Sequence, residues 1–325
     1  MADDLLPAFA VDGGRVPGAM LRRLAREATS GATGITLPTD LRVVPRSPTG
    51  PGVVIRPGGG VMLNRFQSTP TESYEVAIAQ DYDVPVSTTG SAAGRTDYLG
   101  IRIDDPEFSG QAPADPLTAT YWRAVLVPSI PTTYPFLPLA RIVQPASNGA
   151  VSAGMITDLR EVANPREKTV LRANAATVTD AETLTASGTD GEWFPNAGGE
   201  QQIDIPYWAT RMIIRAQWVQ VLHQPGAANG NCWVEYGPYL RPSTRELSTQ
   251  RYAWDTAGAG TNFRTTWTVV DDVYIPASYR GTTQSFIMKA RNDVSNTSTE
   301  RPILDANSGT SLEVRFLEVA DTSTS

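Results

Sequence analysis

The clearest hydrophobic pattern in the sequence is the alternation of apolar and polar positions within residues 211–222. The apolar side chains of this segment are Met212, Ile214, Ala216, Trp218 and Leu222. Arg211, Arg215 and Gln217 stand between them. A period of two places the apolar set on one face of an extended chain, so the segment is predicted to be a half-buried strand. Residues 285–292 and 311–319 repeat this alternation.

Eight strands are predicted in the second half of the chain on the same basis. They cover residues 169–174, 181–186, 201–205, 211–222, 232–239, 263–275, 285–292 and 311–319. This number of antiparallel strands in a domain of this size is typical of a jelly-roll sandwich. Because the last strand ends close to the C-terminus, residues 321–325 are expected to form a loose tail.

One helix is predicted, over residues 17–29. Pro17 suits the first turn of a helix, and a stripe of apolar residues at helical spacing follows it. The stripe consists of Met20, Leu21, Leu24, Ala25 and Ala28. Gly31 and Gly34 end the segment, so the stripe is expected to be the buried face of a short N-terminal helix.

Short strands separated by turn residues are predicted for the rest of the first half. They cover residues 41–44, 52–56, 60–64, 72–79, 97–103, 121–127 and 139–143. Their spacing favours an antiparallel sandwich or a small barrel. The polar segments 81–95 and 104–118 are expected to be exposed loops at opposite ends of strand 97–103.

A domain boundary is predicted near Pro165, in the polar segment ANPREK of residues 163–168. The chain is therefore expected to have two domains, residues 1–165 and residues 166–325. The predicted fold class is all-β, mainly antiparallel, with a β-rich N-terminal module that carries the helix and a jelly-roll-like β-sandwich after it. The 27 glycines and 25 prolines agree with many turns and few long helices.

Composition excludes several classes of function. The net charge is −7 and the arginines are not clustered, so nucleic-acid binding is not expected. The acidic start, MADD, is unlike a signal peptide, and no apolar run approaches the ~18 residues that a membrane span needs, so synthesis in the cytoplasm without membrane insertion is expected. Cys232 is the single cysteine, which rules out a disulfide within the chain.

Four segments of the first half carry a resemblance to a known family. They are SGATGITLPTDLRV at residues 30–43, PGVVIRPGGGVMLNR at 51–65, GRTDYLGIRIDDPE at 94–107 and PLARIVQPASNGAVSAGMITDLR at 138–160. In this order and spacing, most of residues 13–165 resembles the N-terminal region of minor tail and baseplate-appendage proteins of long-tailed phages that infect actinobacteria. Residues 166–325 match no family on this basis.

The resemblance implies a place in a virus particle. Proteins of this kind fix their N-terminal module to the tail tip and project a C-terminal domain toward neighbouring tail proteins or the host envelope, commonly as homotrimers. It therefore implies other tail-tip or baseplate proteins and further copies of this chain as partners, and the virion as location. Ile213, Val219 and Val221 are expected to supply apolar contacts between the copies.

Catalytic groups are few. His223 is the single histidine, and it precedes a Pro-Gly turn, where an exposed side chain is expected. Cys232 follows nearby and is interpreted as a small buried residue. No second histidine or adjacent acid completes a catalytic triad or a zinc site.

Adjacent carboxylates raise the possibility of glycoside hydrolysis. The pairs are Asp104 with Asp105, Asp271 with Asp272, and Asp190 with Glu192. Neighbours on a strand point to opposite faces, so such pairs do not easily converge on one bond. Asp190, Glu192 and Asn196 could bind calcium, but a solvated turn is favoured. Gly58, Gly59 and Gly60 are interpreted as a tight turn, since no Lys-Ser or Lys-Thr follows. No catalytic residue, metal or cofactor is predicted.

Aromatic residues give the stronger signal, because six of the seven tryptophans follow residue 190. Trp218 and Trp267 lie in apolar strand patterns and are assigned to the core. The candidate binding residues are Trp193, Trp233, Tyr236, Tyr239, Tyr252 and Trp254, with Arg241, Arg245 and Arg251 in the same region. Exposed aromatic rings beside polar groups suit the apolar faces of sugars, but also a subunit interface, and some of these rings could belong to the core.

The sequence thus predicts a non-enzymatic structural virion protein. Its N-terminal module docks into the tail tip or baseplate, and its C-terminal sandwich recognises host cell-wall glycan or makes assembly contacts. The alternatives are a tail-associated enzyme that degrades glycans and a secreted lectin or adhesin; the missing export signal disfavours the latter.

Overall fold

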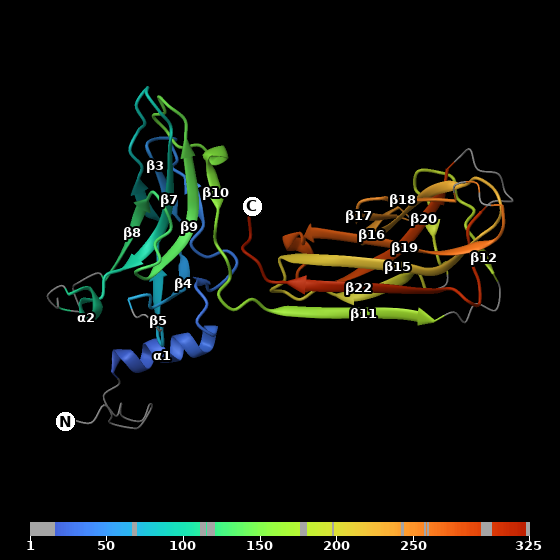
Figure 1. The fold of residues 1–325 in the computed structure, drawn as a ribbon, viewed down its shortest axis with the longest axis horizontal. Coiled ribbons are helices and arrows are strands. Elements are labelled where there is room, and N and C mark those ends of the chain that lie inside the picture. The colour runs from blue at the N-terminus through green and yellow to red at the C-terminus, as the bar shows by residue number, and fades with distance from the viewer. Residues whose placement is uncertain are drawn as a thin grey trace. The chain divides into compact units, whose positions relative to one another are not determined.

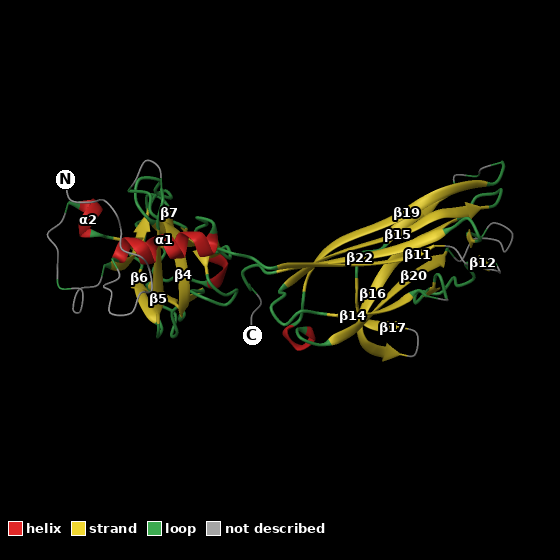
Figure 2. Ribbon diagram, turned by 90° about the horizontal axis from the view of Figure 1, so that it is seen from below, coloured by secondary structure: helices red, strands yellow, loops and turns green. Residues whose placement is uncertain are grey.

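The computed structural model is built almost entirely from antiparallel strands, with one helix of three turns near the N-terminus (Figures 1 and 2). It describes residues 17–322 apart from 67–69, 111–114, 116–120, 176–180, 197, 242–243, 257, 259 and 294–300. The predicted all-β fold class is confirmed. No helix in the described ranges is long and apolar enough to cross a membrane.

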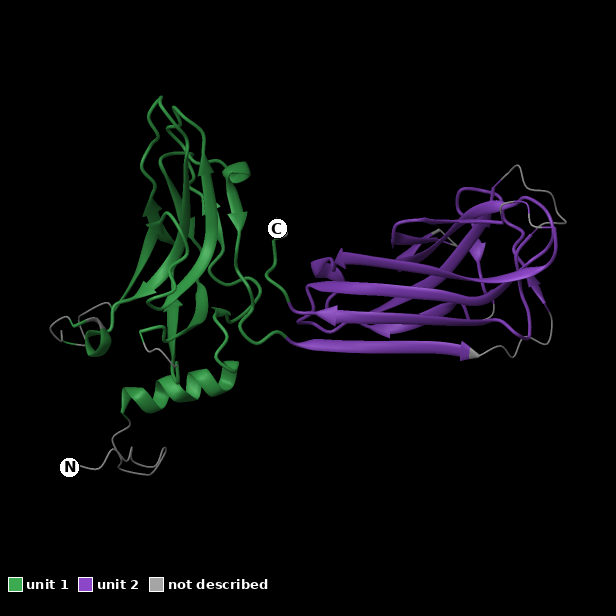
Figure 3. Cartoon of the chain, viewed as in Figure 1, with its two compact units in different colours: residues 1–165, 319–325 green, residues 166–318 purple. Residues whose placement is uncertain are grey.

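The chain divides into two compact units (Figure 3). The first contains residues 1–165 and residues 319–325, and the second contains residues 166–318. The division after Pro165 falls within the polar segment ANPREK of residues 163–168, where the domain boundary was predicted. The last seven residues, which the sequence analysis assigned to the second domain, belong to the first unit.

Three small antiparallel sheets form the first unit: β1-β4-β5, β10-β9-β7-β8 and β2-β3-β6. The elements are α1 (Gly18–Thr29), β1 (Gly34–Ile35), β2 (Val43–Pro45), β3 (Gly52–Ile55), β4 (Gly58–Leu63), β5 (Ser73–Ile78), β6 (Tyr82–Pro85), β7 (Arg95–Ile103), α2 (Pro106–Ser109), β8 (Trp122–Val127), β9 (Phe136–Gln144), a 3-10 turn (Ala153–Met155) and β10 (Ile156–Asp158). Buried side chains from all three sheets share one core. The polar segment 81–95, predicted to be a loop, contributes strand β6.

The glycines at positions 58–60 begin strand β4, so their assignment to a tight turn was wrong. A Cβ at Gly58, where φ is 151°, would lie 2.5 Å from Asp40 Cα, and a Cβ at Gly60 would lie 2.5 Å from Leu137 Cδ2. The residues are glycines because neighbouring segments approach the strand too closely for side chains.

Helix α1 begins at Gly18, one residue later than predicted, because Pro17 is its N-cap, and it turns a different face to the protein. Leu21 and Leu24 are 53% and 47% exposed, whereas Arg22 packs inward and contacts Glu72 on the approach to β5. Arg22 also pairs with Glu107 and lies 5.6 Å from the ring of Tyr74. The apolar stripe of the sequence is therefore largely solvent-facing, because charged partners fix the rotation of the helix.

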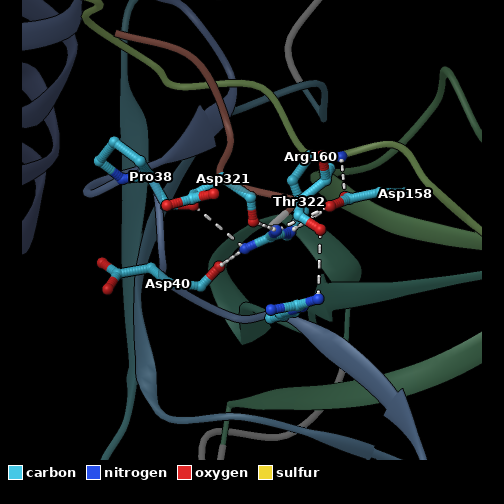
Figure 4. Close-up of polar contacts among 7 residues, drawn as sticks. Pro38, Asp40, Asp158, Arg160, Asp321 and Thr322 are labelled. Atoms are coloured by element: carbon cyan, nitrogen blue, oxygen red, sulfur yellow. Dashed lines mark hydrogen bonds and ion pairs between the residues drawn. The ribbon is translucent and has the colours of Figure 1, made fainter. Parts of the chain in front are cut away.

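The C-terminal residues are held in the first unit by Arg160, whose side chain is completely buried (Figure 4). Its guanidinium pairs with Asp158 at 2.7 Å and donates to the carbonyl oxygens of Asp40 at 2.6 Å and Asp321 at 3.0 Å. The Asp321 N–H donates to the Pro38 carbonyl at 2.9 Å. The expectation of a loose tail from residue 321 was wrong for Asp321 and Thr322, because Arg160 and Arg42 bind their backbone oxygens.

The second unit is a sandwich of two antiparallel sheets. Its elements are β11 (Glu167–Ala175), β12 (Glu182–Thr183), β13 (Glu192–Trp193), β14 (Glu200–Asp204), β15 (Arg211–His223), β16 (Asn229–Arg241), β17 (Thr244–Ser248), β18 (Tyr252–Asp255), β19 (Phe263–Tyr274), a 3-10 turn (Ala277–Tyr279), β20 (Thr283–Asn292), β21 (Ile303–Leu304) and β22 (Gly309–Leu317). Strands β11, β22, β15 and β19 form one sheet with the short β21 and β12. Strands β20 and β16 centre the other, flanked by β13 and β14 on one side and β17 and β18 on the other. Long strands successive in sequence mostly alternate between the sheets, as in a jelly roll.

The predicted alternation in β15 holds as far as Trp218 and then reverses. Gln220 has φ 57°, and the register of β15 against β19 shifts between Trp218 and Val221. This β-bulge turns Val221 inward, where it is fully buried, while Val219 stays 36% exposed. Val221 therefore belongs to the core and not to an outer face that could contact another copy, as was predicted.

Candidate functional site

A groove of about 580 Å³ lies at one edge of the second unit. Its lining residues are Glu182, Thr183, Thr185, Gly191, Glu192, Trp193 and Asn196. They come from two short strands in different sheets and the segments that follow them, since β12 pairs with β21 and β13 pairs with β20. The groove combines an aromatic residue with carboxylates, hydroxyls and an amide.

The two carboxylates of the groove have different surroundings. Both oxygens of Glu192 accept hydrogen bonds from the segment after β12: Oε1 from the Thr185 and Ala186 N–H groups, and Oε2 from Thr185 Oγ1 at 2.8 Å. Glu182 Oε1 accepts from the Asn196 N–H at 2.6 Å. Burial, reinforced by the charge of Glu192, raises the pKa of Glu182.

Trp193 also belongs to a cluster on the outer face of its sheet. In the register of β13, β20 and β16, Trp193 lies opposite Lys289, and Lys289 lies opposite Trp233. Facing residues of paired strands project to the same side. Lys289 Nζ is 3.2 Å from Glu235 Oε1 and 5.7 Å from the Trp233 ring centre, and its side chain is completely buried.

Arg245 on β17 completes this cluster. Its guanidinium carbon lies 3.4 Å from the ring centre of Tyr239 and 5.8 Å from that of Trp193, and it pairs with Glu200 at 2.8 Å. The exposed Arg251 lies 4.2 Å from the Trp233 ring centre. Cation–π contacts thus support the rings on this face.

Five of the residues that the sequence singled out therefore come together, and the others do not. The cluster contains Trp193, Trp233, Tyr239, Arg245 and Arg251, although Trp233 is completely buried beneath it. Tyr239 is 60% exposed and Trp193 is half-buried, so these two rings are accessible.

Tyr236 and Trp254 face the sandwich core, which excludes direct contact with a ligand. They are 3% and 5% exposed, and Trp254 stacks on Trp267 with ring centres 5.1 Å apart. The prediction of an exposed loop ring at Trp254 was wrong, because residues 252–255 form β18 and turn the indole inward. Tyr252 is 36% exposed and its hydroxyl donates to the Val270 carbonyl. The side chain of Arg241 lies outside the described residues.

His223 is buried, contrary to the predicted exposed position. It is 1% exposed, stacks on Phe263 and accepts or donates one hydrogen bond with Thr265 Oγ1 at 2.9 Å. Its place on the last position of β15, after the bulge, turns the ring between the sheets. Cys232 is buried as predicted, and burial raises the pKa of its thiol to about 12.

The buried His223 predicts a loss of stability in mild acid. Burial lowers its pKa to about 4, from about 6.5 in the unfolded chain. Between these two pKa values the unfolded chain binds a proton at His223 and the folded chain does not. The contribution of the buried, neutral His223 to the free energy of unfolding is therefore full above pH ~6.5, and it falls by about 3 kcal/mol as the pH drops toward ~4. Urea unfolding of the second unit at pH 7 and pH 4.5 measures the effect. A His223→Phe variant should show a weaker pH dependence, and an equal dependence in both proteins would contradict this origin.

Two of the adjacent acid pairs have their carboxylates bound to other groups of the protein. Asp104 pairs with Arg102 and Arg123, while Asp105 caps α2. Asp271 accepts from the Gln250 N–H and Asp272 pairs with Arg211. Within the described ranges, no three His, Cys, Asp or Glu side chains gather as a metal site.

Comparisons with family models and with curated proteins find no match. Among solved structures, the chain is similar to infectious bursal disease virus strain Gx, at 14% identity over 90% of this chain and 72% of that chain, with TM-score 0.27. The VP2 subviral particle of the same virus matches at 14% identity over 94% and 78%, with TM-score 0.26. A tandem CBM22 domain of Paenibacillus barcinonensis Xyn10C matches at 8% identity over 82% and 91%, with TM-score 0.23. TM-scores this low leave these likenesses without weight for function.

Proposed function

We propose that this chain is a non-enzymatic structural protein of a phage tail tip or baseplate, and that its jelly-roll unit binds glycan on the host surface. The groove at Trp193 carries the glycan part of the proposal. A half-buried indole beside carboxylates, hydroxyls and an amide offers both a stacking face and hydrogen-bond partners for a sugar.

The place in the virion rests on the sequence resemblance of residues 13–165. In this proposal the first unit docks on other tail proteins. Leu21 and Leu24 on α1 are exposed apolar side chains of that unit. A homotrimer also remains a prediction, and of the residues expected at its interface, Ile213 and Val219 stay on the outer face of β15.

Trp193→Ala in the full chain should weaken binding to actinobacterial cell-wall glycan about ten-fold or more, because the stacking surface is lost. Trp193→Phe should retain part of the affinity. Calorimetric titration with wall fragments measures the dissociation constant of each variant. Tyr274→Ala, which removes a 48% exposed ring from β19, serves as the matched control and should leave binding unchanged. Equal binding by the Trp193→Ala variant and the native chain would exclude this groove.

Glycan hydrolysis is a second candidate function, favoured by the presence of Glu182 and Glu192 in one groove. A raised pKa at Glu182 suits a general acid. However, both oxygens of Glu192 already bind the segment at residues 185–186, which favours a structural role for this carboxylate. Release of reducing sugar from wall polysaccharide, abolished by Glu182→Gln, would establish hydrolysis instead.

A further inference from the structure

One outward-facing row of side chains in the second unit reads apolar, acidic, basic, apolar across strands β11, β22, β15 and β19. In the register of these strands, Leu171 lies beside Glu313, Glu313 beside Arg215, and Arg215 beside Val270. Facing residues of paired strands project to the same side of a sheet. The next residue on β22, Val314, belongs to the core, so the row faces away from the core. Leu171 and Val270, at the two ends of the row, are 59% and 39% exposed.

The two halves of this outer face differ in charge. In the stretch of β15 before its bulge, the face also carries two ion pairs, one in each half: Glu167 with Arg315 on β11 and β22, and Arg211 with Asp272 on β15 and β19. Each of these pairs is neutral, which leaves Glu313 as the remaining charge of one half and Arg215 as that of the other. Neither Glu313 nor Arg215 forms an ion pair with any described residue. The two halves of the face are therefore opposite in charge.

The order of the row makes the face complementary to a second copy of itself. A copy turned about an axis parallel to the strands keeps its heights along them and exchanges the two halves. The row then meets itself in reverse order, with Glu313 facing Arg215 of the second copy and Leu171 facing its Val270. A two-fold axis across the strands, through the same row, would instead oppose Glu313 to Glu313 and Arg215 to Arg215, and like charges repel.

We propose that copies of this chain associate through the outer face of the sheet formed by β11, β22, β15 and β19, about an axis parallel to its strands. The contact between Glu313 and Arg215 of neighbouring copies fixes the register, and the contacts between Leu171 and Val270 bury apolar surface at both ends of the row. The inference goes beyond the proposed glycan binding and tail docking and depends on neither. It gives the predicted self-association a surface.

Charge exchange tests whether this contact joins two copies. Arg215→Glu makes the middle of the row doubly acidic and Glu313→Arg makes it doubly basic, so each variant alone should have a dissociation constant about ten-fold or more above that of the native chain. An equimolar mixture of the two variants should recover association, because each acidic row then meets a basic one. Sedimentation equilibrium of the full chain over a concentration series measures the molar mass. Mixing cannot cure a folding defect within one chain, so recovery identifies a contact between copies.

Leu171→Asp is a second test, because a side chain this exposed can be replaced with little effect on folding. It should weaken association about ten-fold or more, since it places a carboxylate against Val270 of the next copy. Leu240→Asp is the matched control: Leu240 is 63% exposed but lies on β16 of the other sheet, so this variant should associate like the native chain. Circular dichroism checks that both variants are folded.

The outcomes separate this interface from the proposed function. A native chain that stays monomeric throughout the series would overturn the inference, and so would association that Leu171→Asp leaves unchanged. A mixture of folded charge variants that associates no better than either variant alone would also overturn it. Titration of wall glycan on the same samples reports the glycan site independently. Self-association without glycan binding would remove only that site, and glycan binding without self-association would remove only this interface.

Discussion

Replacing Arg160 by leucine should destabilise the first unit by about 3 kcal/mol or more. The substitution leaves the carbonyl oxygens of Asp40 and Asp321 without their donor and Asp158 without its cation, in a place where the arginine side chain is completely buried. Hydrogen exchange under native conditions measures this loss of stability separately for each peptide, so the first unit can be followed independently of the second. The Asp321 amide, bound to Pro38, should lose its protection first.

Arg56→Leu is the matched control for this prediction. Arg56 pairs with Asp81 in the same unit, but the two side chains are 52% and 51% exposed. Such surface pairs contribute less than about 1 kcal/mol. Deletion of residues 319–325 should reproduce part of the Arg160→Leu effect. If Arg160→Leu proved no more damaging than Arg56→Leu, the C-terminal residues would not be held as the contacts indicate.

The long strands β15, β19 and β22 of the second unit could be predicted from the sequence because buried and more exposed positions largely alternate along them. All eight predicted strands overlap observed ones, from β11 to β22. Strands β13, β17, β18 and β21 were missed, because two to five residues are too few to show a period. This error mattered at Trp254, which looked like a loop residue and lies in the core.

The hydrophobic period also gave the wrong buried face where a β-bulge or an ion pair set the orientation of a strand or helix. The bulge at Gln220 reversed the inward face of β15, so Val221 was assigned to the wrong side. Helix α1 presents Leu21 and Leu24 to solvent because Arg22 pairs with Glu72, which is distant in sequence. Neither the bulge nor the ion pair leaves a signal in the local pattern.

The candidate site was found only in part. Trp193 stood out as an aromatic residue in a polar segment. Glu192 was considered only together with Asp190, as a carboxylate pair for glycan hydrolysis and as a calcium ligand. Glu182 was missed, because its approach to Glu192 and Asn196 depends on two short strands in different sheets. The hydrogen bond from the Arg160 guanidinium to the Asp321 carbonyl was also missed, because 161 positions separate the two residues in the sequence.

Glu235→Ala should destabilise the second unit by about 3–5 kcal/mol, because it breaks the ion pair at 3.2 Å between Glu235 and the fully buried Lys289. The Trp233 indole N–H and the Arg245 backbone N–H lose their acceptor as well. Urea unfolding followed by tryptophan fluorescence measures the effect, since six of the seven tryptophans lie in this unit.

Replacing both residues tests whether the loss comes from breaking this ion pair. Glu235→Leu combined with Lys289→Met removes the charge together with its partner, and should recover most of the stability lost in Glu235→Ala. Glu167→Ala is the control, because Glu167 pairs with Arg315 while both side chains are nearly half exposed, and should cost less than about 1 kcal/mol. If the double variant were as unstable as Glu235→Ala, packing around Trp233 would be the cause instead. If Glu235→Ala matched Glu167→Ala, Lys289 would be neutral in the folded protein, because burial, which lowers its pKa, would then outweigh the attraction of Glu235.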